Sequence, residues 1–350
     1  MTQQARAGDV IGGRYQLIES IGTGGMGRVW KAYDERLRTG VALKELWLTG
    51  PMEPRQRAAL IRRAELEAIS AVRLRDHPNI VTVHDVVVER NVPWIVMQLV
   101  SGGTLQQLLR NGPLKVFEAG RLAAALLGAL SAAHAQGIVH RDIKPANVMI
   151  TDVGDVLLAD FGIAAPETGT GLTSTGVVVG SAAYLAPERV DGKPGKASSD
   201  LFSLGVTLYE AVEGLSPFQR DSWLASAHAV RYDQAPPMRR AGHLVPLITA
   251  LMAKDPAARP TIGRALAMVD ASAAHDGDMP RDKAPASKNA PLVRRMAVYL
   301  GLIEGDLRPA SGAGAESYRR DDGTSPMRKV AVYLGLIEDE GRRPDPRTRG

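Results

Sequence analysis

The chain has 350 residues, 45% of them hydrophobic, which is enough for one large or two ordinary domains with a sizeable core. Its 43 basic and 38 acidic residues leave a net charge of +5 without a basic block, so a nucleic-acid-binding surface is not expected. The absence of cysteine excludes disulfides, thiolate catalysis and cysteine-ligated zinc.

The N-terminus gives no indication of export. The first ten residues lack the apolar core of a signal peptide. No uninterrupted apolar run reaches the ~18 residues of a membrane-spanning helix. The nearest, Leu122–Ala135, is short and contains Ser131 and His134. We therefore expect a buried helix there, and a cytoplasmic protein.

The first recognisable element is a glycine-rich loop at residues 21–29, with the pattern Gly-x-Gly-x-x-Gly-x-Val. Glycines let backbone N–H groups approach phosphate oxygens closely. A dinucleotide-binding fold uses the same glycines and an acidic residue about 20 positions later, and Glu45 lies near that place. That fold opens a helix after the loop, whereas residues 28–33 are rich in β-branched and aromatic types and lead into a turn. The sequence therefore predicts a β-hairpin.

The remainder of the first hundred residues predicts strands and one helix. Lys44 lies in the apolar strand 41–45. Residues 55–75 are charged, rich in alanine and free of glycine and proline, which predicts a helix. Two strands follow, at about 81–89 and 93–99. Glu65 and Glu67 of this helix are both candidate ion-pair partners of Lys44. They point about 200° apart around the helix, so only one of them can face Lys44.

From residue 102 to about 271 the pattern is mainly helical, with apolar helical spacing at 105–109 and 117–135. The second helix leads into His140-Arg141-Asp142-Ile143-Lys144-Pro145-Ala146-Asn147, and Asp160-Phe161-Gly162 follows thirteen residues after Asn147. Phosphoryl transfer from ATP needs a carboxylate that orients the hydroxyl, a cation beside the moving phosphoryl, and an amide with a second carboxylate for Mg²⁺. The two motifs together supply all of these groups.

These motifs resemble those of the protein kinase family, in the form found in bacterial Ser/Thr kinases. The resemblance covers about residues 10–271. It implies an α+β, two-lobed fold, with a β-rich N-lobe at about 10–99 and a helical C-lobe at about 100–271. It also implies ATP with Mg²⁺ (or Mn²⁺) as cofactors and proteins as substrates.

The resemblance implies a role for each polar residue of the two motifs. Asp142 would be the base, and it would mainly orient the substrate hydroxyl, because a free carboxylate is a poor base for an alcohol. Lys144 would contact the γ-phosphate, and its place two residues after Asp142 is typical of kinases that modify Ser and Thr. Asn147 and Asp160 would hold the metal ion.

The resemblance also implies the ATP-binding residues. Lys44 would contact the α- and β-phosphates, and the landmark His77-Pro78-Asn79-Ile80-Val81 favours Glu67 over Glu65 as its ion-pair partner. Met97 would be the gatekeeper beside the adenine. The implied ATP-binding set is Ile21, Gly22, Thr23, Gly24, Gly25, Met26, Gly27, Val29, Ala42, Lys44, Met97, Gln98, Val100 and Met149, with Gln98 and Val100 acting through their backbone.

The segment 160–188 has little periodic pattern and is rich in threonine, which is typical of a functional or disordered loop. A phosphate on it could pair with Arg141 and order it. Alignment with the family on residues 180–184 points to Thr173 and Thr175 as phosphorylation sites, modified in trans within a transient homodimer. A plain threonine-rich surface loop is the alternative.

Three polar residues of the C-lobe are expected to be structural. In the family, the glutamate of Ala186-Pro187-Glu188 pairs with a distant arginine, which would be Arg259 here. Asp200, on a predicted buried helix, would brace the backbone of the catalytic loop.

The tail, residues 272–350, contains a duplicated peptide. Residues 297–304, Ala-Val-Tyr-Leu-Gly-Leu-Ile-Glu, recur unchanged at 331–338, each copy after a basic pair and between low-complexity linkers. We call the segments 291–306 and 325–340 the tail repeats.

As a helix, a tail repeat would present an apolar face, and the basic pair would lie at its N-terminal end. Such a helix can lie on a membrane, with its apolar face in the lipid and its basic residues near anionic headgroups. The peptide resembles the N-terminal membrane-binding segment of the SepF cell-division proteins, which suggests a membrane or division-protein partner. The alternatives are a strand added to a partner's sheet, or packing against the kinase itself. Two weak copies would gain avidity. Lipid binding would make the protein peripheral at the inner face of the membrane.

Three functions are compatible with these motifs. An active Ser/Thr protein kinase is favoured, because Lys44, Asp142, Asn147 and Asp160 are all present. A pseudokinase scaffold that presents the tail repeats is the alternative. A kinase-fold enzyme that acts on a small molecule is disfavoured by the long threonine-rich loop, which suits protein substrates.

Overall fold

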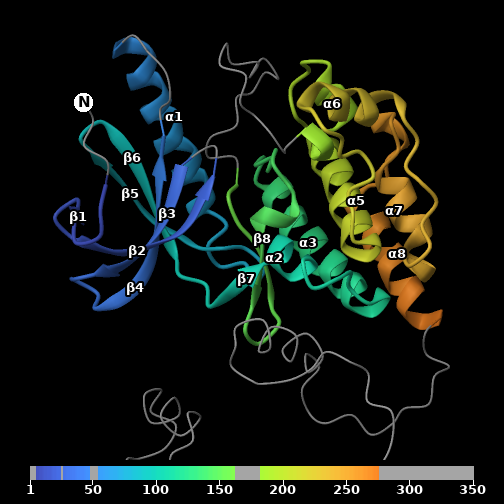
Figure 1. Ribbon diagram of the computed structural model, residues 1–350, viewed down its shortest axis with the longest axis horizontal. Helices are drawn as coiled ribbons and strands as arrows, with labels where there is room; N and C mark the ends of the chain where they lie inside the picture. The colour runs from blue at the N-terminus through green and yellow to red at the C-terminus, as the bar shows by residue number, and fades with distance from the viewer. Residues whose placement is uncertain (1–4, 25–26, 48–53, 162–181, 276–350) are drawn as a thin grey trace, which may run out of the picture. The chain divides into compact units, whose positions relative to one another are not determined.

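A computed structural model describes residues 5–24, 27–47, 54–161 and 182–275, all within one compact unit, Met1–Glu304 (Figure 1). The tail repeats lie outside the described residues, as do Gly25, Met26, Thr173 and Thr175. The predictions made for these parts of the chain therefore stay predictions.

The N-lobe is an antiparallel six-stranded sheet with one long helix (Figure 1). The strand order is β1-β2-β3-β4-β6-β5. The elements are β1 (Val10–Ile11), β2 (Tyr15–Gly24), β3 (Gly27–Asp34), β4 (Thr39–Leu46), α1 (Pro54–Val72), β5 (Val83–Glu89) and β6 (Val92–Gln98). The predicted hairpin is confirmed, because β2 pairs with β3 up to Gly24 opposite Gly27. A dinucleotide-binding fold would have a helix at this position.

Strand register gives the sheet two chemically different faces. Directly opposed residues of paired strands point to the same face, and successive residues alternate. Val29 opposes Lys44, so both point to one face, which we call the inner face. Arg28 opposes Glu45, and both point to the outer face. Most of the outer face is covered by apolar packing of Ile11, Tyr15, Leu17, Trp30, Ala32, Val41, Leu43, Trp94 and Val96.

The C-lobe combines a small sheet with a helical core. Strands β7 (Gly102–Thr104), β8 (Val148–Thr151) and β9 (Val156–Leu158) form a three-stranded sheet. The helices are α2 (Leu105–Leu109), α3 (Val116–Ala135), α4 (Pro187–Val190), α5 (Ala197–Glu213), α6 (Trp223–Tyr232), α7 (Val245–Leu251) and α8 (Ile262–His275). Short 3₁₀ turns occupy Pro145–Asn147, Ala182–Tyr184, Gly242–Leu244 and Pro256–Ala258. The expected α+β, two-lobed fold is confirmed.

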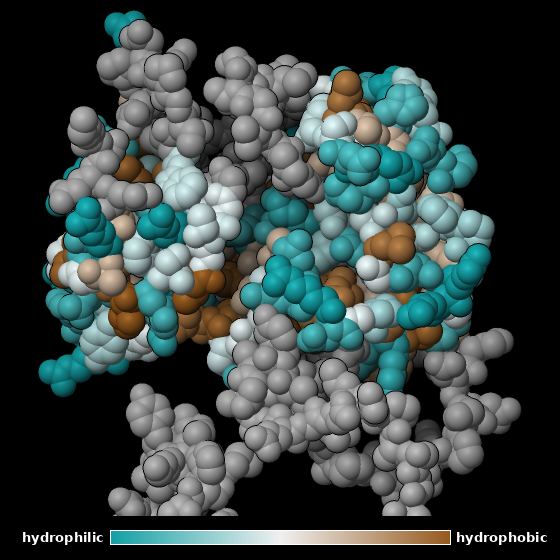
Figure 2. All heavy atoms as spheres, viewed as in Figure 1, coloured by the Kyte–Doolittle hydropathy of each residue, from teal (hydrophilic) through white to brown (hydrophobic). Residues whose placement is uncertain are grey.

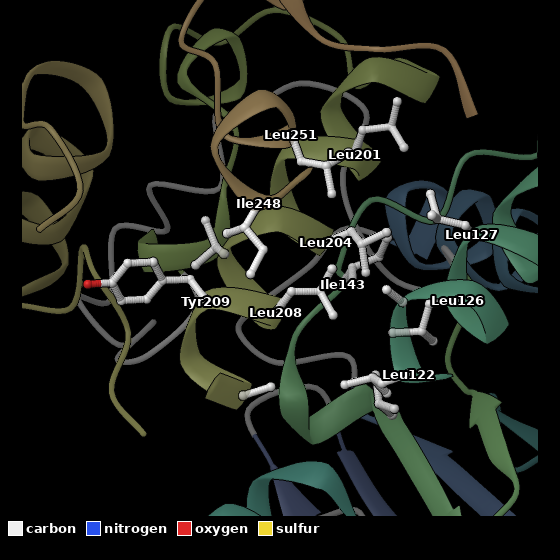
Figure 3. Packing of buried hydrophobic residues seen from close by; sticks show 14 of the residues in the cluster. Leu122, Leu126, Leu127, Ile143, Leu201, Leu204, Leu208, Tyr209, Ile248 and Leu251 are labelled. Carbon is white, nitrogen blue, oxygen red and sulfur yellow. The ribbon is translucent and has the colours of Figure 1, made fainter. Parts of the chain in front are cut away.

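Helix α3 lies in the centre of the C-lobe core. Figure 3 shows the packing of α3, α5 and α7 through Leu122, Leu126, Leu127, Leu201, Leu204, Leu208, Ile248 and Leu251. Within the described ranges, α3 is the one helix with the length and hydropathy of a membrane span, and 50% of its apolar window is buried inside the protein. The expected buried helix is confirmed. Figure 2 shows a largely polar surface over the C-lobe helices, with small hydrophobic spots.

The segment after α1 joins the N-lobe to the small sheet of the C-lobe. Ile80 forms an isolated parallel bridge with Leu158. Leu158 donates its N–H to the carbonyl of Asn79 at 2.9 Å, and the Asn79 side chain donates to the carbonyl of Val156 at 2.8 Å. These bonds fix the end of β9, two residues before Asp160, against the N-lobe.

Candidate active site

The inner face of the N-lobe sheet presents Lys44 to Asp160. The Lys44 ammonium nitrogen lies 2.9 Å from Oδ1 of Asp160, and both side chains are largely buried. Burial alone would raise the pKa of Asp160, but the charge and the hydrogen bond of Lys44 outweigh it, so this pKa lies below its ordinary value. Asp160 is therefore a carboxylate at neutral pH.

The expected partner of Lys44 on α1 stays untested. Residues 65 and 67 are both on α1, but the side chain of Glu67 lies outside the described part of the chain. Glu65 is half-buried. The ion pair that the structure does show for Lys44 is the one with Asp160.

The catalytic loop, residues 140–147, is attached to α5 through one buried carboxylate. Asp200 accepts the backbone N–H groups of His140 and Arg141, both at 2.8 Å. Nε2 of His134, on α3, lies 2.7 Å from the same carboxylate. Asp200 is 1% exposed, so these bonds form in a low-dielectric interior. The bracing role predicted for Asp200 is confirmed.

His140 is a structural residue of the same loop. Its Nε2 lies 2.8 Å from the carbonyl oxygen of Ala159, and its Nδ1 lies 3.3 Å from the backbone nitrogen of Asp142. A neutral ring with its proton on Nε2 satisfies both bonds. The ring also packs at 4.6 Å from that of Phe161. His140 thus links the catalytic loop to the segment that carries Asp160.

Asp142 is held between a cation and an amide. The Lys144 ammonium lies 2.8 Å from Oδ2 of Asp142. Asn147 donates its side-chain N–H₂ group to Oδ2 of Asp142 at 2.9 Å and to its backbone carbonyl at 2.7 Å. Asp142 and Lys144 are each about one-fifth exposed, so solvent and ligand can reach them. Asn147 is left with its amide oxygen for a ligand.

The oxygen atoms of Asn147 and Asp160 fit a divalent metal ion. The backbone N–H of Ala159 donates to the carbonyl of Asn147 at 2.9 Å, which places Asn147 beside the residue that precedes Asp160. An amide oxygen and a carboxylate are hard ligands of the kind that Mg²⁺ prefers, with phosphate and water oxygens completing the shell. No group of three or more His, Cys, Asp or Glu side chains forms a separate metal site in the described ranges.

An apolar cluster lies between the two lobes. Its buried members are Ala42, Val81, Met97 and Leu157, and its partly buried members are Val29, Leu99, Val100, Met149 and Ala159. Five of these residues belong to the ATP-binding set implied by the sequence: Val29, Ala42, Met97, Val100 and Met149. Leu157 also belongs to this cluster, but the set implied by the sequence does not include it. The β8–β9 register places Leu157 directly opposite Met149. The N–H of Gln98 donates to the carbonyl of Thr82 at 2.9 Å, so any ligand contact from this backbone uses its carbonyl oxygen.

The glycine-rich loop joins β2 to β3. Ile21, Gly22, Thr23 and Gly24 are in β2, and Ile21 is 49% exposed. Gly27 begins β3 with a φ of 151°, and a Cβ atom there would lie 1.9 Å from the carbonyl oxygen of Glu45. Only glycine allows this close approach of β3 to β4.

The predicted pair of Glu188 and Arg259 is confirmed. Two guanidinium nitrogens of Arg259 each lie 2.8 Å from a different carboxylate oxygen of Glu188, and the hydroxyl of Ser199 donates to the same carboxylate at 2.7 Å. The Arg259 side chain is fully buried. This pair ties the chain after the threonine-rich segment to the C-lobe.

The two-lobed fold and the placement of Lys44, Asp142, Asn147 and Asp160 define a protein kinase. The family model described as "Protein kinase domain" matches residues 15–269, and the chain belongs to this family.

The relatives are bacterial Ser/Thr protein kinases. PknA of Mycobacterium tuberculosis is 40% identical over 264 residues, which are 73% of this chain and 60% of PknA. PknL of the same species is 35% identical over 302 residues, or 84% of this chain and 74% of PknL. PrkC of Bacillus subtilis is 38% identical over 255 residues, or 71% of this chain and 39% of PrkC. Alignment with this chain therefore leaves two-fifths of PknA unmatched.

A solved structure supports the same fold. The crystal structure of the PknI kinase domain from M. tuberculosis, determined on a point mutant, aligns with a TM-score of 0.57 and 27% identity. The alignment covers 79% of this chain and 100% of the PknI domain.

Proposed function

We propose that this protein transfers the γ-phosphoryl group of ATP to Ser and Thr hydroxyls of protein substrates, with residues 10–271 as the catalytic domain. The observation that carries the proposal is the position of Asp142. Its carboxylate is fixed by Lys144 and Asn147, next to the segment that carries Asp160. The relatives that this chain matches over most of its length are Ser/Thr protein kinases by name.

The chemistry follows from the positions of these side chains. The hydroxyl oxygen of the substrate attacks the γ-phosphorus, the bond to the β-γ bridging oxygen breaks, and Asp142 accepts the hydroxyl proton late in transfer. Lys144 offsets the charge of the transferred group. Lys44 holds the α- and β-phosphates. Asn147 and Asp160 would hold a metal ion, Mg²⁺ or Mn²⁺, through their oxygen atoms, and that ion would neutralise charge on the phosphates.

The apolar cluster between the lobes provides a place for the adenine. Val29 and Ala42 would cover it from the N-lobe, and Met149 and Leu157 would pack against it from the C-lobe. Met97 would restrict its depth. Apolar walls with a few polar backbone groups at one edge are typical of such ligand sites.

The decisive experiment is labelled ATP with Mg²⁺ and a mixed protein substrate. The wild type should place label on Ser and Thr, and Asp142→Asn should reduce the rate by about 10²–10⁴-fold, because it removes the base that orients the hydroxyl. Asp155→Asn, at an exposed turn between β8 and β9, is the matched control and should retain activity. A wild type that transfers nothing would favour the pseudokinase scaffold.

Regulation by autophosphorylation is part of the proposal. Thr173 and Thr175 would be modified in trans in a transient homodimer, and the phosphate would be recognised by Arg141. Support comes from Arg141, which directly precedes Asp142 and is anchored through its backbone to Asp200. Peptide mapping after incubation with Mg²⁺–ATP should find phosphate on both threonines. An active sample with both unmodified would exclude the mechanism.

We further propose that the tail repeats direct a cytoplasmic kinase to an anionic surface at the inner face of the membrane, or to a cell-division protein there. The support is the basic pair before each apolar repeat. A fluorescent protein fused to residues 272–350 should concentrate at the cell periphery and bind anionic liposomes. Diffuse fluorescence without liposome binding would remove the membrane assignment.

A further inference from the structure

A small surface groove lies between helix α3 and the turn that joins β8 to β9. We call it the α3 groove, and it encloses about 90 Å³. One side comes from the first half of α3, and the other comes from the turn and the start of β9. The residues that line these two sides are Glu118, Arg121, Ala125, Gly154, Asp155 and Val156. None of them belongs to the proposed active site.

The turn at one side of the α3 groove holds a valine out into solvent. The N–H of Thr151 donates to the carbonyl of Asp155, and the N–H of Asp155 donates to the hydroxyl of Thr151, both at 2.9 Å. Gly154 closes the turn with a φ of 84°. Because these bonds fix the backbone, Val153 at the tip of the turn stays 59% exposed.

The α3 side of the groove presents a phenylalanine. Phe117 lies in the first turn of α3 and is 61% exposed. Arg121, which lines the groove, comes one helical turn later, and residues four apart on a helix are neighbours on its surface. Single exposed apolar side chains are common, but Phe117 and Val153 border the same groove from opposite sides. Together they form an apolar surface that a bound peptide would bury.

The turn also gives the groove an acidic side. Asp152 and Asp155 lie on either side of Val153 in the sequence, and residues 151–155 contain no basic residue. A peptide that matches this side of the groove therefore combines basic residues with apolar ones, because complementary charges favour the correct partner and register.

The first tail repeat has this composition. The basic pair Arg294-Arg295 is followed directly by Met296–Ile303, in which seven residues are apolar and one is glycine. The repeat thus carries its positive charges immediately beside a continuous apolar segment, as the acidic turn and the exposed Val153 require.

The first tail repeat can also reach the α3 groove. Arg294 lies 19 positions after His275, where α8 ends, and α8 packs with α3 in the C-lobe core through Ala265 and Val269. A flexible linker of this length has a typical end-to-end distance of about 24 Å and an extended length of about 60 Å. The whole of α3 is about 30 Å long, so the linker is long enough to span it.

We propose that the α3 groove is a docking site for the first tail repeat of the same chain. The apolar residues of the repeat cover Phe117 and Val153, and Arg294-Arg295 lies beside the acidic turn. Arg328 of the second repeat lies 53 positions after His275, and this longer linker lowers its local concentration about fivefold, so the first copy occupies the groove. The second copy remains for the membrane surface proposed above.

The test uses the full chain and its lack of cysteine. Gly120→Cys, on α3 near Phe117, is combined with Gly301→Cys in the first repeat, so every apolar side chain stays in place. With oxidised glutathione as the oxidant, and without lipid or ATP, this pair should form an intramolecular disulfide. The matched control pairs Gly301→Cys with Gly263→Cys on α8, because a Cβ at Gly120 or Gly263 meets no atom of the described residues within 4 Å. The first pair should react about tenfold faster, because docking raises the local thiol concentration.

Further variants of the chain with Gly120→Cys and Gly301→Cys test the groove itself. Phe117→Ser should slow disulfide formation to the rate of the control pair, whereas Leu37→Ser, at a 69% exposed position of the N-lobe, should have no effect. Moving the tail cysteine to Gly335 of the second copy should slow the reaction about fivefold. Equal rates for the groove pair and the control pair, or no effect of Phe117→Ser, would overturn the docking site. A disulfide between two chains, with a rate that rises with protein concentration, would assign the groove to a second copy instead.

A competition experiment keeps the site testable if Phe117→Ser fails to fold. An excess of a synthetic peptide of residues 292–304 should slow disulfide formation between Gly120→Cys and Gly301→Cys several-fold. The same peptide with Arg294 and Arg295 replaced by serine should compete less. An unchanged rate in the presence of the wild-type peptide would contradict the proposal. The assay contains neither lipid nor ATP, so its outcome does not depend on membrane binding or on phosphoryl transfer.

Discussion

The ammonium group of Lys44 and the carboxylate of Asp160 lie 2.9 Å apart, although they belong to different lobes. β4 holds Lys44 through pairs on both sides, with Val29 of β3 and with Ile95 of β6. Asp160 follows β9, which is bonded to Asn79 and Val81 of the N-lobe. The ion pair therefore depends on the relative position of the lobes, and it keeps the carboxylate of Asp160, the proposed metal ligand, charged.

Lys44→Met should abolish most phosphoryl transfer and shift a pH dependence. Without the lysine charge, burial of Asp160 should raise its pKa, so Mg²⁺-dependent ATP binding should be lost at a higher pH than in the wild type. Calorimetric titration with Mg²⁺–ATP between pH 5 and 8 measures this shift. Lys31→Met, on the neighbouring strand and exposed, should leave the profile unchanged. An unshifted profile in Lys44→Met would show that Lys44 does not control the charge of Asp160.

Gly27→Ala should destabilise the N-lobe. The added Cβ would lie 1.9 Å from the carbonyl oxygen of Glu45, and the φ of 151° disfavours any side chain, so β3 and β4 must separate. We expect a fall of several degrees in melting temperature together with weaker ATP binding. Gly24→Ala is the matched control for stability, because its Cβ would meet no atom of the described residues within 4 Å. Equal melting temperatures for the two variants would contradict this account.

Breaking the pair of Glu188 and Arg259 should cost about 3–5 kcal/mol, because either residue alone is an uncompensated buried charge. Arg259→Met should show this loss in urea unfolding. Glu188→Leu combined with Arg259→Met should recover part of it, since no charge is left unpaired. Lys31→Ala, which breaks the exposed pair with Glu19, should cost less than about 1 kcal/mol. If Arg259→Met and Lys31→Ala lowered the free energy of unfolding by similar amounts, burial of the pair of Glu188 and Arg259 would not explain its contribution to stability.

Asp34 should make stability depend on pH in the acid range. Hydrogen bonding from Arg14 lowers the pKa of Asp34 from 3.8 to about 2, against the opposing effect of burial. The folded state therefore binds the proton more weakly than the unfolded state does. Stabilisation is complete above pH ~4 and is lost as the pH falls toward 2.

Asp34→Asn should be less stable than the wild type at pH 7 and should flatten the loss of stability between pH 4 and 2. Urea unfolding at pH 7, 4 and 2.5 measures both effects. Glu19→Gln, at an exposed position on β2, should follow the wild-type curve. A parallel decline of Asp34→Asn and wild type below pH 4 would assign the acid sensitivity to other carboxylates.

Much of the fold could be predicted because local patterns have direct structural meaning. The β-branched and aromatic residues 28–33 after the glycines form a strand, and the apolar run Leu122–Ala135 forms a buried helix. The pairing of Glu188 with Arg259 was predictable only from the family resemblance, because nothing in either local sequence indicates a partner so far along the chain.

Other features depend on tertiary contacts that sequence patterns do not specify. Leu157 joins the apolar cluster between the lobes because β9 pairs with β8, and that register is fixed only in the folded chain. The burial of Glu45 was also unexpected, since a glutamate is normally exposed. It follows from strand alternation, which directs the residue after Lys44 to the opposite, covered face of the sheet.

Arg141 and Asp160 both have left-handed backbone conformations, with φ of 70° and 64°. Such a conformation costs a non-glycine residue roughly 1–2 kcal/mol, although aspartate tolerates it better than arginine. Glycine would relieve this strain at position 160, but it would also leave Lys44 as a buried cation without its carboxylate partner, which costs more than the strain. Selection for thermal stability should therefore retain Asp160, so at this position a stability screen and an activity screen favour the same residue.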